Sequence, residues 1–121
     1  MRVLGIRWLG MGTDRFDDLV AFFHDVLGLR LEERRSPDLA ELFMPDGGKV
    51  EIYTPVLMPP DRMQAGFLVD DIDAAERELR GRHVEIVGPR GLLPGGYQWQ
   101  RFRAPDGRVF SLLEDPRIRR E

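Results

Sequence analysis

The chain repeats one order of strand and helix signals twice, and this repeat constrains its fold more than any other feature. Apolar alternation and helical spacing predict five elements in the first half, at residues 3–13, 14–27, 29–34, 39–44 and 49–54. The same signals predict five elements in the second half, at residues 64–69, 72–80, 84–87, 97–103 and 108–114. Each half is therefore predicted to be β-α-β-β-β, and such fixed-order self-similarity indicates a repeated architecture.

Two equivalent turns align the halves. The sequence Pro-Asp-Gly, in which proline presets φ and glycine accepts a positive φ, occurs at 45–47 and at 105–107, which is an offset of 60 residues. The acids that begin the two helices, Asp14 and Asp70, lie 56 residues apart. We expect modules at about 3–54 and 62–115, joined by a proline-containing linker at 55–61. A chain of 121 residues is predicted to form a single domain from them.

Each predicted helix has one apolar face. The face of the first helix consists of Phe16, Leu19, Val20, Phe23, Val26 and Leu27. Gly28 follows it as a helix stop. The second helix buries Ile72, Ala75 and Leu79, and Gly81 ends it.

Composition excludes several classes of protein. The net charge of −3 argues against nucleic-acid binding, because contacts to phosphates need a basic face. Without cysteine there is no disulfide and no thiolate metal site. No stretch approaches the ~18 apolar residues of a membrane helix, and no apolar signal core follows Met1. We therefore expect a cytoplasmic protein that binds neither nucleic acid nor a membrane.

Three short segments carry a family resemblance. They are Phe-Phe-His-Asp-Val-Leu-Gly-Leu at 22–29, Val-Asp-Asp-Ile-Asp at 69–73 and Ala-Pro-Asp-Gly-Arg at 104–108. The segments resemble the first helix end, the second strand-to-helix turn and the last turn of the vicinal oxygen chelate superfamily, which includes glyoxalase I, bleomycin-resistance proteins and extradiol dioxygenases. The resemblance implies an α+β fold of two tandem βαβββ modules, with a cupped, mostly antiparallel sheet and helices on its convex face. It also implies a homodimer.

The resemblance further implies four positions that hold a divalent metal, on the first and last strand of each module. Through the offsets of the repeat, they map to Trp8 and Gln64 on the first strands and to Glu51 and Ser111 on the last. An indole N–H cannot ligate a cation, and a serine hydroxyl is a poor ligand for transition metals. We therefore predict no metal ligands and no cofactor. A divalent metal with water-completed ligation is the alternative.

Strand alternation predicts which side chains share the cup with these four positions. The predicted ligand-binding residues are Trp8, Phe43, Glu51, Tyr53, Gln64, Trp99, Arg101 and Ser111. Arg101 and Trp99 together would clamp a planar anionic ligand, through forked hydrogen bonds and stacking. In a structural alternative, the tryptophans fill the cup or pack against a second subunit, and Arg101 pairs with Glu51 or Glu41.

Three functions remain open. The first is a metal-free protein of the bleomycin-resistance type that binds a small molecule. The second is a lyase, isomerase or dioxygenase acting on a small carbonyl or aromatic compound, with a divalent metal or with Glu51, as a lone carboxylate, in the role of catalytic base. The third is a partner-binding module with a filled cup. The glycine-rich segment 88–96 is predicted to be a loop over the cup mouth, and its glycines would permit a lid.

Overall fold

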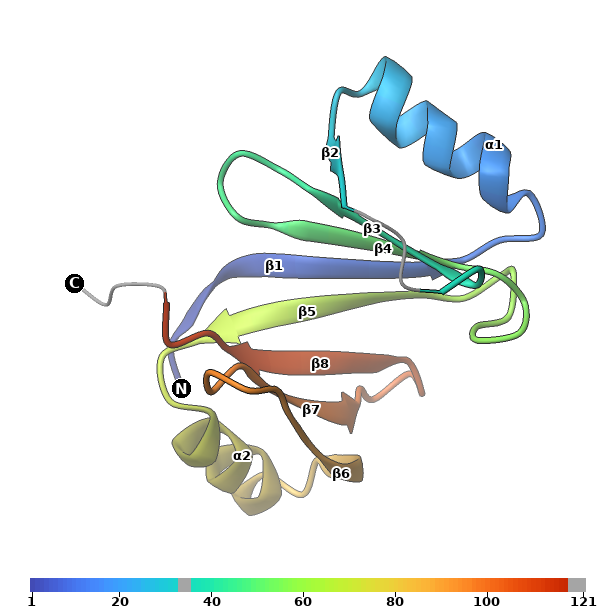
Figure 1. The fold of residues 1–121 in the computed structure, drawn as a ribbon. Coiled ribbons are helices and arrows are strands. Elements are labelled where there is room, and N and C mark those ends of the chain that lie inside the picture. Colours follow the sequence, from blue (N-terminus) through green and yellow to red (C-terminus); the bar gives the residue numbers. More distant parts are fainter. Residues whose placement is uncertain (33–35, 118–121) are drawn as a thin grey trace. The chain divides into compact units, whose positions relative to one another are not determined.

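The computed structural model describes residues 1–32 and 36–117 and shows the predicted βαβββ order in each half (Figure 1). The first half contains β1 (Val3–Gly12), α1 (Phe16–Ala21), the π-helix η1 (Phe22–Val26), β2 (Arg30–Leu31), β3 (Leu39–Phe43) and β4 (Lys49–Tyr53). The second half contains β5 (Met63–Val69), α2 (Ile72–Gly81), β6 (Glu85–Leu92), β7 (Gln98–Arg103) and β8 (Val109–Glu114). Residues 33 and 34 of the strand predicted at 29–34 lie outside the described residues.

The chain forms two compact units. The first unit is residues 8–64, and the second unit is residues 1–7 with 65–121. The strand order is β2-β3-β4-β1 in the first unit and β5-β8-β7-β6 in the second. Within them, β1 and β4 pair in parallel, as do β5 and β8, and the other pairs are antiparallel. The predicted α+β class with mostly antiparallel pairing is confirmed.

The core of the first unit lies between its strands and α1. Its buried residues are Met11, Val20, Ala40, Leu42, Val50 and Ile52, with Phe16, Leu19 and Phe23 packed against them. The alternating positions Val50 and Ile52 on β4 are buried beside the helix. Glu51, which lies between them on the strand, therefore faces the opposite side of the sheet.

The predicted apolar face of the first helix is wrong at its end. Val26 is 68% exposed and Leu27 is also exposed. The cause is the π-helix η1, in which the N–H of Leu27 donates to the carbonyl of Phe22, five residues earlier. Because each π turn holds more residues than an α turn, positions after it rotate away from the face that α-helical spacing predicts.

The core of the second unit lies between its strands and α2. Ile72, Ala75 and Leu79 are buried as predicted, together with Val69 and Leu112, and Phe102 packs against them. Two acids satisfy the free N–H groups at the helix start. Asp71 Oδ1 accepts from Ala74 N at 3.0 Å, and Glu114 Oε1 accepts from Ile72 N at 2.9 Å.

The segment predicted to be a loop, 88–96, is half strand. β6 continues through Leu92, and its pairing with β7 shifts register between Val87 and Gly91, where β6 has two residues more than β7. This β-bulge absorbs Gly88 and Pro89, the residues whose turn-forming character suggested a loop. The remaining connection is a tight turn, closed by the N–H of Leu93 on the carbonyl of Tyr97 at 2.9 Å. Of the segment that was predicted to form a loop or lid, only the hairpin turn after Leu92 therefore lies outside the strand.

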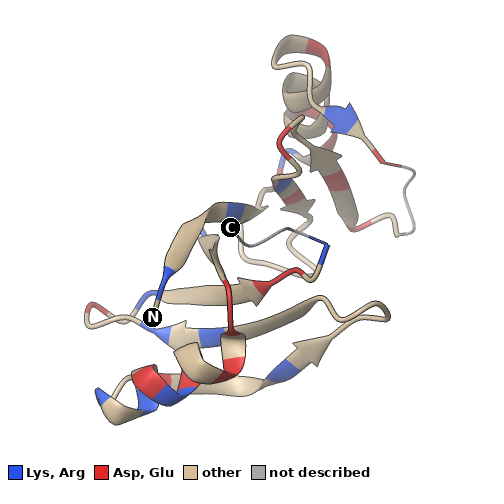
Figure 2. Ribbon diagram, turned by 90° about the vertical axis from the view of Figure 1, so that its left-hand side faces the viewer, with Lys and Arg blue, Asp and Glu red and all other residues tan. Residues whose placement is uncertain are grey.

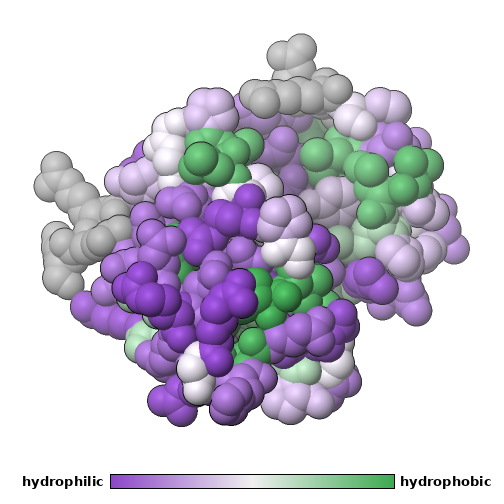
Figure 3. Space-filling model, turned by 90° about the horizontal axis from the view of Figure 1, so that it is seen from below, coloured by the Kyte–Doolittle hydropathy of each residue, from purple (hydrophilic) through white to green (hydrophobic). Residues whose placement is uncertain are grey.

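The surface mixes both signs of charge. Blue and red segments alternate along the ribbon in Figure 2, in keeping with the near balance of 18 basic and 21 acidic residues. In the view of Figure 3, apolar patches lie between hydrophilic ones. Among the described residues, no helix has the length and apolar character needed to cross a membrane.

Candidate ligand-binding faces

Each unit has a sheet face opposite its helix, which we call its open face. In the first unit, Leu9 and Met11 belong to the helix-side core, so Trp8 and Gly10 on β1 lie on the open face. In the second unit, Phe102 packs on the helix side, and its neighbours Arg101 and Arg103 lie on the open face. The predicted strand phases are therefore confirmed for the strands that carry most of the candidate site.

The open face of the first unit holds four interacting side chains, which we call the Lys49 cluster: Trp8, Glu41, Lys49 and Glu51. The indole N–H of Trp8 donates to Oε1 of Glu51. The ammonium Nζ of Lys49 lies 3.7 Å from the same oxygen and 3.3 Å from Oε2 of Glu41. The three charged side chains are only 15–26% exposed, so water screens their contacts less than at an open surface.

An aromatic side chain borders this cluster. The ring of Phe43 lies 5.9 Å from the ammonium of Lys49 and 4.8 Å from the guanidinium carbon of Arg30. Tyr53 follows Glu51 by two residues on β4 and shares its face, and Gln64 is half-buried on β5. The first unit therefore gathers Trp8, Phe43 and Glu51 from the predicted site around Lys49.

The contacts of Glu51 change one sequence expectation. Glu51 was expected as a lone carboxylate, but its Oε1 contacts both an indole N–H and an ammonium group. Lys49, which was not among the predicted ligand-binding residues, contacts both Glu41 and Glu51.

The residues that the resemblance maps to metal positions do not fit a divalent ion. Glu51 supplies the only carboxylate among them, and an ammonium group already lies beside it. Trp8 directs a hydrogen-bond donor at that same carboxylate, where a metal site would present lone pairs. In the described part of the chain, no three His, Asp or Glu side chains are grouped in a way that would hold a metal ion.

The open face of the second unit presents Trp99 and Arg101 from β7. Trp99 pairs with Gly91 across β6 and with Leu113 across β8, and Arg101 pairs with Ser111. The indole lies directly over Gly91, where an added Cβ would come within 1.9 Å of its Cε2 atom. The ring of Tyr97 lies 6.1 Å from that of Trp99, tilted by 48°.

Arg101 and Arg103 have different surroundings, although they lie two residues apart on the same face. Arg103 donates to Glu85 at 3.3 Å and to the carbonyl of Gly107 at 3.0 Å. Within the second unit, no acid among the described residues forms an ion pair with Arg101. Its guanidinium instead lies over the backbone of Gly88, where an added Cβ would come within 2.7 Å of Nη2.

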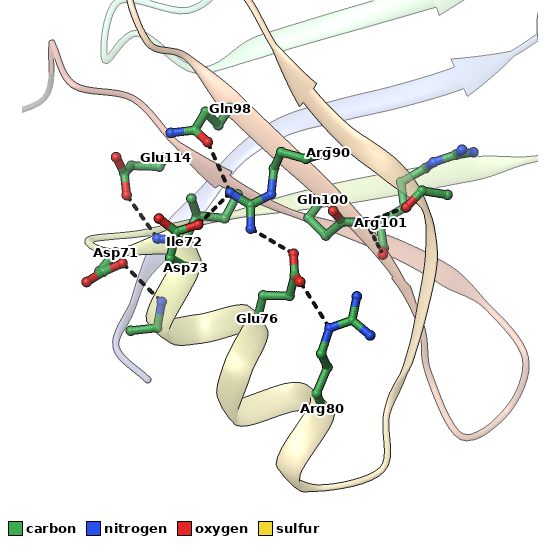
Figure 4. A network of polar contacts seen from close by, with 12 residues as sticks. Asp71, Ile72, Asp73, Glu76, Arg80, Arg90, Gln98, Gln100, Arg101 and Glu114 are labelled. Atoms are coloured by element: carbon green, nitrogen blue, oxygen red, sulfur yellow. Dashed lines mark hydrogen bonds and ion pairs between the residues drawn. The ribbon is translucent and has the colours of Figure 1, made fainter.

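A buried amide holds the β-bulge beneath Arg101. Gln100 is 2% exposed, and its Nε2 donates to the carbonyls of Gly88 at 3.0 Å and of Val87 at 3.4 Å (Figure 4). A bulge leaves such carbonyls without ladder partners, and a side chain that donates to them stabilises it. Gln100 thus fixes the position of Gly88 from the helix side of the sheet.

Arg90, which was expected in a loop over the cup, binds the helix instead. Its guanidinium donates to Asp73 at 2.9 Å, to Gln98 at 3.0 Å and to Glu76 at 2.7 Å (Figure 4). The hydrogen bond from Arg90 holds the pKa of the Glu76 carboxyl below its usual value, although partial burial acts in the opposite direction. Arg90 therefore ties the bulged strand β6 to α2.

Sequence reasoning missed the glycines that support the aromatic and cationic side chains. Gly10 lies under Trp8, since an added Cβ would come within 2.3 Å of its Cζ2 atom, and Gly91 lies under Trp99 in the same way. A glycine inside a strand indicates that another group approaches the backbone closely, and the sequence shows such a glycine at Gly10. The same indication could not be read at Gly88 and Gly91, because their segment was predicted to be a loop.

Comparison with known proteins places the chain in a family. Residues 5–112 match the family model of the Glyoxalase/Bleomycin resistance protein/Dioxygenase superfamily. The chain is similar to the Mn(II)-bound glyoxalase from Novosphingobium aromaticivorans, with a TM-score of 0.77 and 25% identity over 94% of this chain and 40% of that one. It therefore spans less than half the length of that glyoxalase.

Two further solved structures share the fold over nearly their whole length. Methylmalonyl-CoA epimerase from Mycobacterium tuberculosis has a TM-score of 0.69 at 20% identity, covering 93% of this chain and 89% of that one. A superfamily member from Vibrio splendidus 12B01 has a TM-score of 0.68 at 18% identity, covering 91% and 99%. No curated protein matches the sequence. Because the family model spans nearly the whole chain, this protein belongs to the Glyoxalase/Bleomycin resistance protein/Dioxygenase superfamily.

Proposed function

We propose that this protein binds a small molecule on the open face of its second unit and does so without a catalytic metal. The observation that carries the proposal is the contrast between two charged groups. Glu51, at a family metal position, already has an indole donor and an ammonium group on one oxygen. Arg101 has no acid partner among the described residues of its own unit and lies two positions from a half-buried tryptophan.

The surroundings of Arg101 support a binding role. A small-molecule site combines apolar walls with a few directed polar groups. Trp99, which is half-buried, lies two positions from Arg101 on the same strand, and the ring of Tyr97 lies 6.1 Å from its indole. Arg103 has its acceptors within the protein, so it offers less to a ligand than Arg101 does.

The proposal is tested by binding measurements in the presence of a chelator. We expect fragments from a small aromatic library to shift the Trp99 indole N–H signal in ¹H–¹⁵N spectra, assigned with the W99F variant, equally with and without EDTA. Metal content by mass spectrometry should be far below one equivalent per chain. Binding that requires Mn(II), Ni(II) or Zn(II) would overturn the proposal, and light scattering on the same samples tests the predicted homodimer.

The Glu51→Gln variant separates binding from catalysis with Glu51 as base. A binder that uses the second unit retains its fragment affinity in this variant. An enzyme with Glu51 as base would lose turnover by orders of magnitude. The Asp61→Asn variant, which neutralises an exposed acid in a turn, is the matched control for the loss of one charge.

A further inference from the structure

We infer that the ligand is a planar carboxylate, with its flat part on Trp99 and its carboxylate on Arg101, and that Gly88 and Gly91 determine this specificity. The inference rests on the proposed function, because it names the ligand class of that same face. It is carried by the charge, the spacing and the backbone support of these two side chains.

The positive charge of Arg101 favours an anionic ligand. The open-face neighbours of Arg101 across the sheet are Ser111 on β8 and Val87 on β6, and neither carries a charge. Arg101 is exposed and has no acid partner among the described residues of its own unit. A guanidinium presents a planar fork of N–H donors that matches the two oxygens of a carboxylate. The charge of Arg101 therefore favours a carboxylate over a neutral group.

The distance between Trp99 and Arg101 favours a flat ligand. Trp99 and Arg101 are two residues apart on one strand, so their Cα atoms lie about 7 Å apart on the same face. A single-ring carboxylate spans this separation with its ring against the indole and its oxygens at the guanidinium. Stacking on an indole requires a flat partner, and a saturated ring of equal size fits it less well.

Two glycines on β6 leave open the space above the sheet that the side chains of Trp99 and Arg101 occupy. The indole of Trp99 occupies the space above Gly91, and the guanidinium of Arg101 occupies the space above Gly88. Gly88 has φ +69°, a conformation that the bulge requires. A Cβ at either position would displace the side chain that lies there, so both glycines shape the proposed site. Gln100 holds Gly88 in place through its carbonyl.

Three probes test the ligand class: benzoate, benzamide and cyclohexanecarboxylate. They are a planar anion, a planar neutral molecule and a non-planar anion. We expect benzoate to bind at least tenfold more tightly than the other two, followed through the Trp99 indole N–H signal. Equal affinity for benzamide overturns the role of charge, and equal affinity for cyclohexanecarboxylate overturns the role of planarity.

The arginine variants test which guanidinium binds. Arg101→Gln should remove the preference for benzoate over benzamide. Arg103→Gln, its matched control on the same strand and face, should keep that preference. If both variants retain it, or if Arg103→Gln removes it, Arg101 is not the recognition residue.

The glycine variants test the role of the backbone. Gly88→Ala should lower benzoate affinity about tenfold without changing benzamide affinity. Gly95→Ala is the control, because Gly95 has a similarly unfavourable φ of +94° but open space around an added Cβ. An unchanged benzoate affinity in Gly88→Ala, or an equal loss in Gly95→Ala, overturns the role of Gly88.

The outcomes distinguish the inference from the proposed function. Neutral aromatic fragments that bind at Trp99 with no preference for benzoate leave the proposed function standing and overturn the ligand class. If neither the probes nor the fragment library shift the Trp99 signal, both fail.

Discussion

The indole of Trp99 lies in the space that a side chain at Gly91 would take, within 1.9 Å of where a Cβ would stand. The two residues pair across β6 and β7, so the contact crosses neighbouring strands on one face of the sheet. Trp8 and Gly10 form the same kind of pair along a single strand. In both units, an indole therefore occupies the space above a strand glycine that a Cβ would otherwise fill.

Gly91→Ala should destabilise the protein by about 1–3 kcal/mol, because the new methyl group displaces the indole as in an overpacked core. Urea unfolding followed by circular dichroism measures this loss. The control is Gly81→Ala at the end of α2, where an added Cβ meets nothing within 4 Å and no loss is expected. Equal stability of Gly91→Ala and the wild type would contradict the contact.

Lys49→Met should raise the affinity for Mn(II) roughly tenfold, because it removes a positive charge about 4 Å from Glu51. The carboxylates of Glu41 and Glu51, which pair across β3 and β4, then lack their shared cation. Calorimetric titration measures the affinity. Arg30→Met removes a charge that pairs with Glu32 and serves as the control. The prediction is wrong if Lys49→Met binds Mn(II) no more tightly than the control.

The Glu76–Arg90 ion pair should make stability depend on pH in the acidic range. Arg90 depresses the pKa of Glu76, whose usual value is 4.5. A depressed carboxyl pKa stabilises the fold above the unfolded pKa, and this contribution is lost as pH falls through the folded pKa. We expect Glu76→Gln to flatten the decline in stability below about pH 4.5. Urea midpoints from pH 6 to pH 3 measure the slope.

Asp61→Asn is the control for this pH dependence, since Asp61 is an exposed acid in a turn and no described residue forms an ion pair with it. Its slope should equal that of the wild type. An unchanged slope in Glu76→Gln would show that the Arg90 contact does not couple folding to protonation.

Gln100→Leu should cost about 1–3 kcal/mol of unfolding free energy, because it leaves the carbonyls of Val87 and Gly88 without their buried donor. Gln98→Leu is the comparison on the same strand, since Arg90 keeps Asp73 and Glu76 as acceptors when Gln98 is lost. The loss of unfolding free energy in Gln98→Leu should be smaller than in Gln100→Leu. A larger loss for Gln98→Leu would contradict the role of Gln100 in holding the bulge.

The sequence predicted the open and buried sides of the strands because alternation is a local property. On β4, the order Lys49-Val50-Glu51-Ile52 places charged and apolar side chains on opposite faces, and the structure confirms this. Phe102 on β7 follows the same rule. Prediction failed where a residue is added to a regular element. The π-helix turned Val26 and Leu27 outward, and the bulge converted a predicted loop into strand β6.

The sequence by itself determined the order of the elements, the two turns and the phase of the strands, since these depend on neighbouring residues. Only the tertiary structure decided that Lys49 contacts both Glu41 and Glu51, because an ion pair depends on cross-strand distance. It also decided that Arg90 binds α2 and that Arg101 lies over Gly88. The physical reason is the bulge in β6, which turns Arg90 toward α2 and places Gly88 beneath the guanidinium of Arg101.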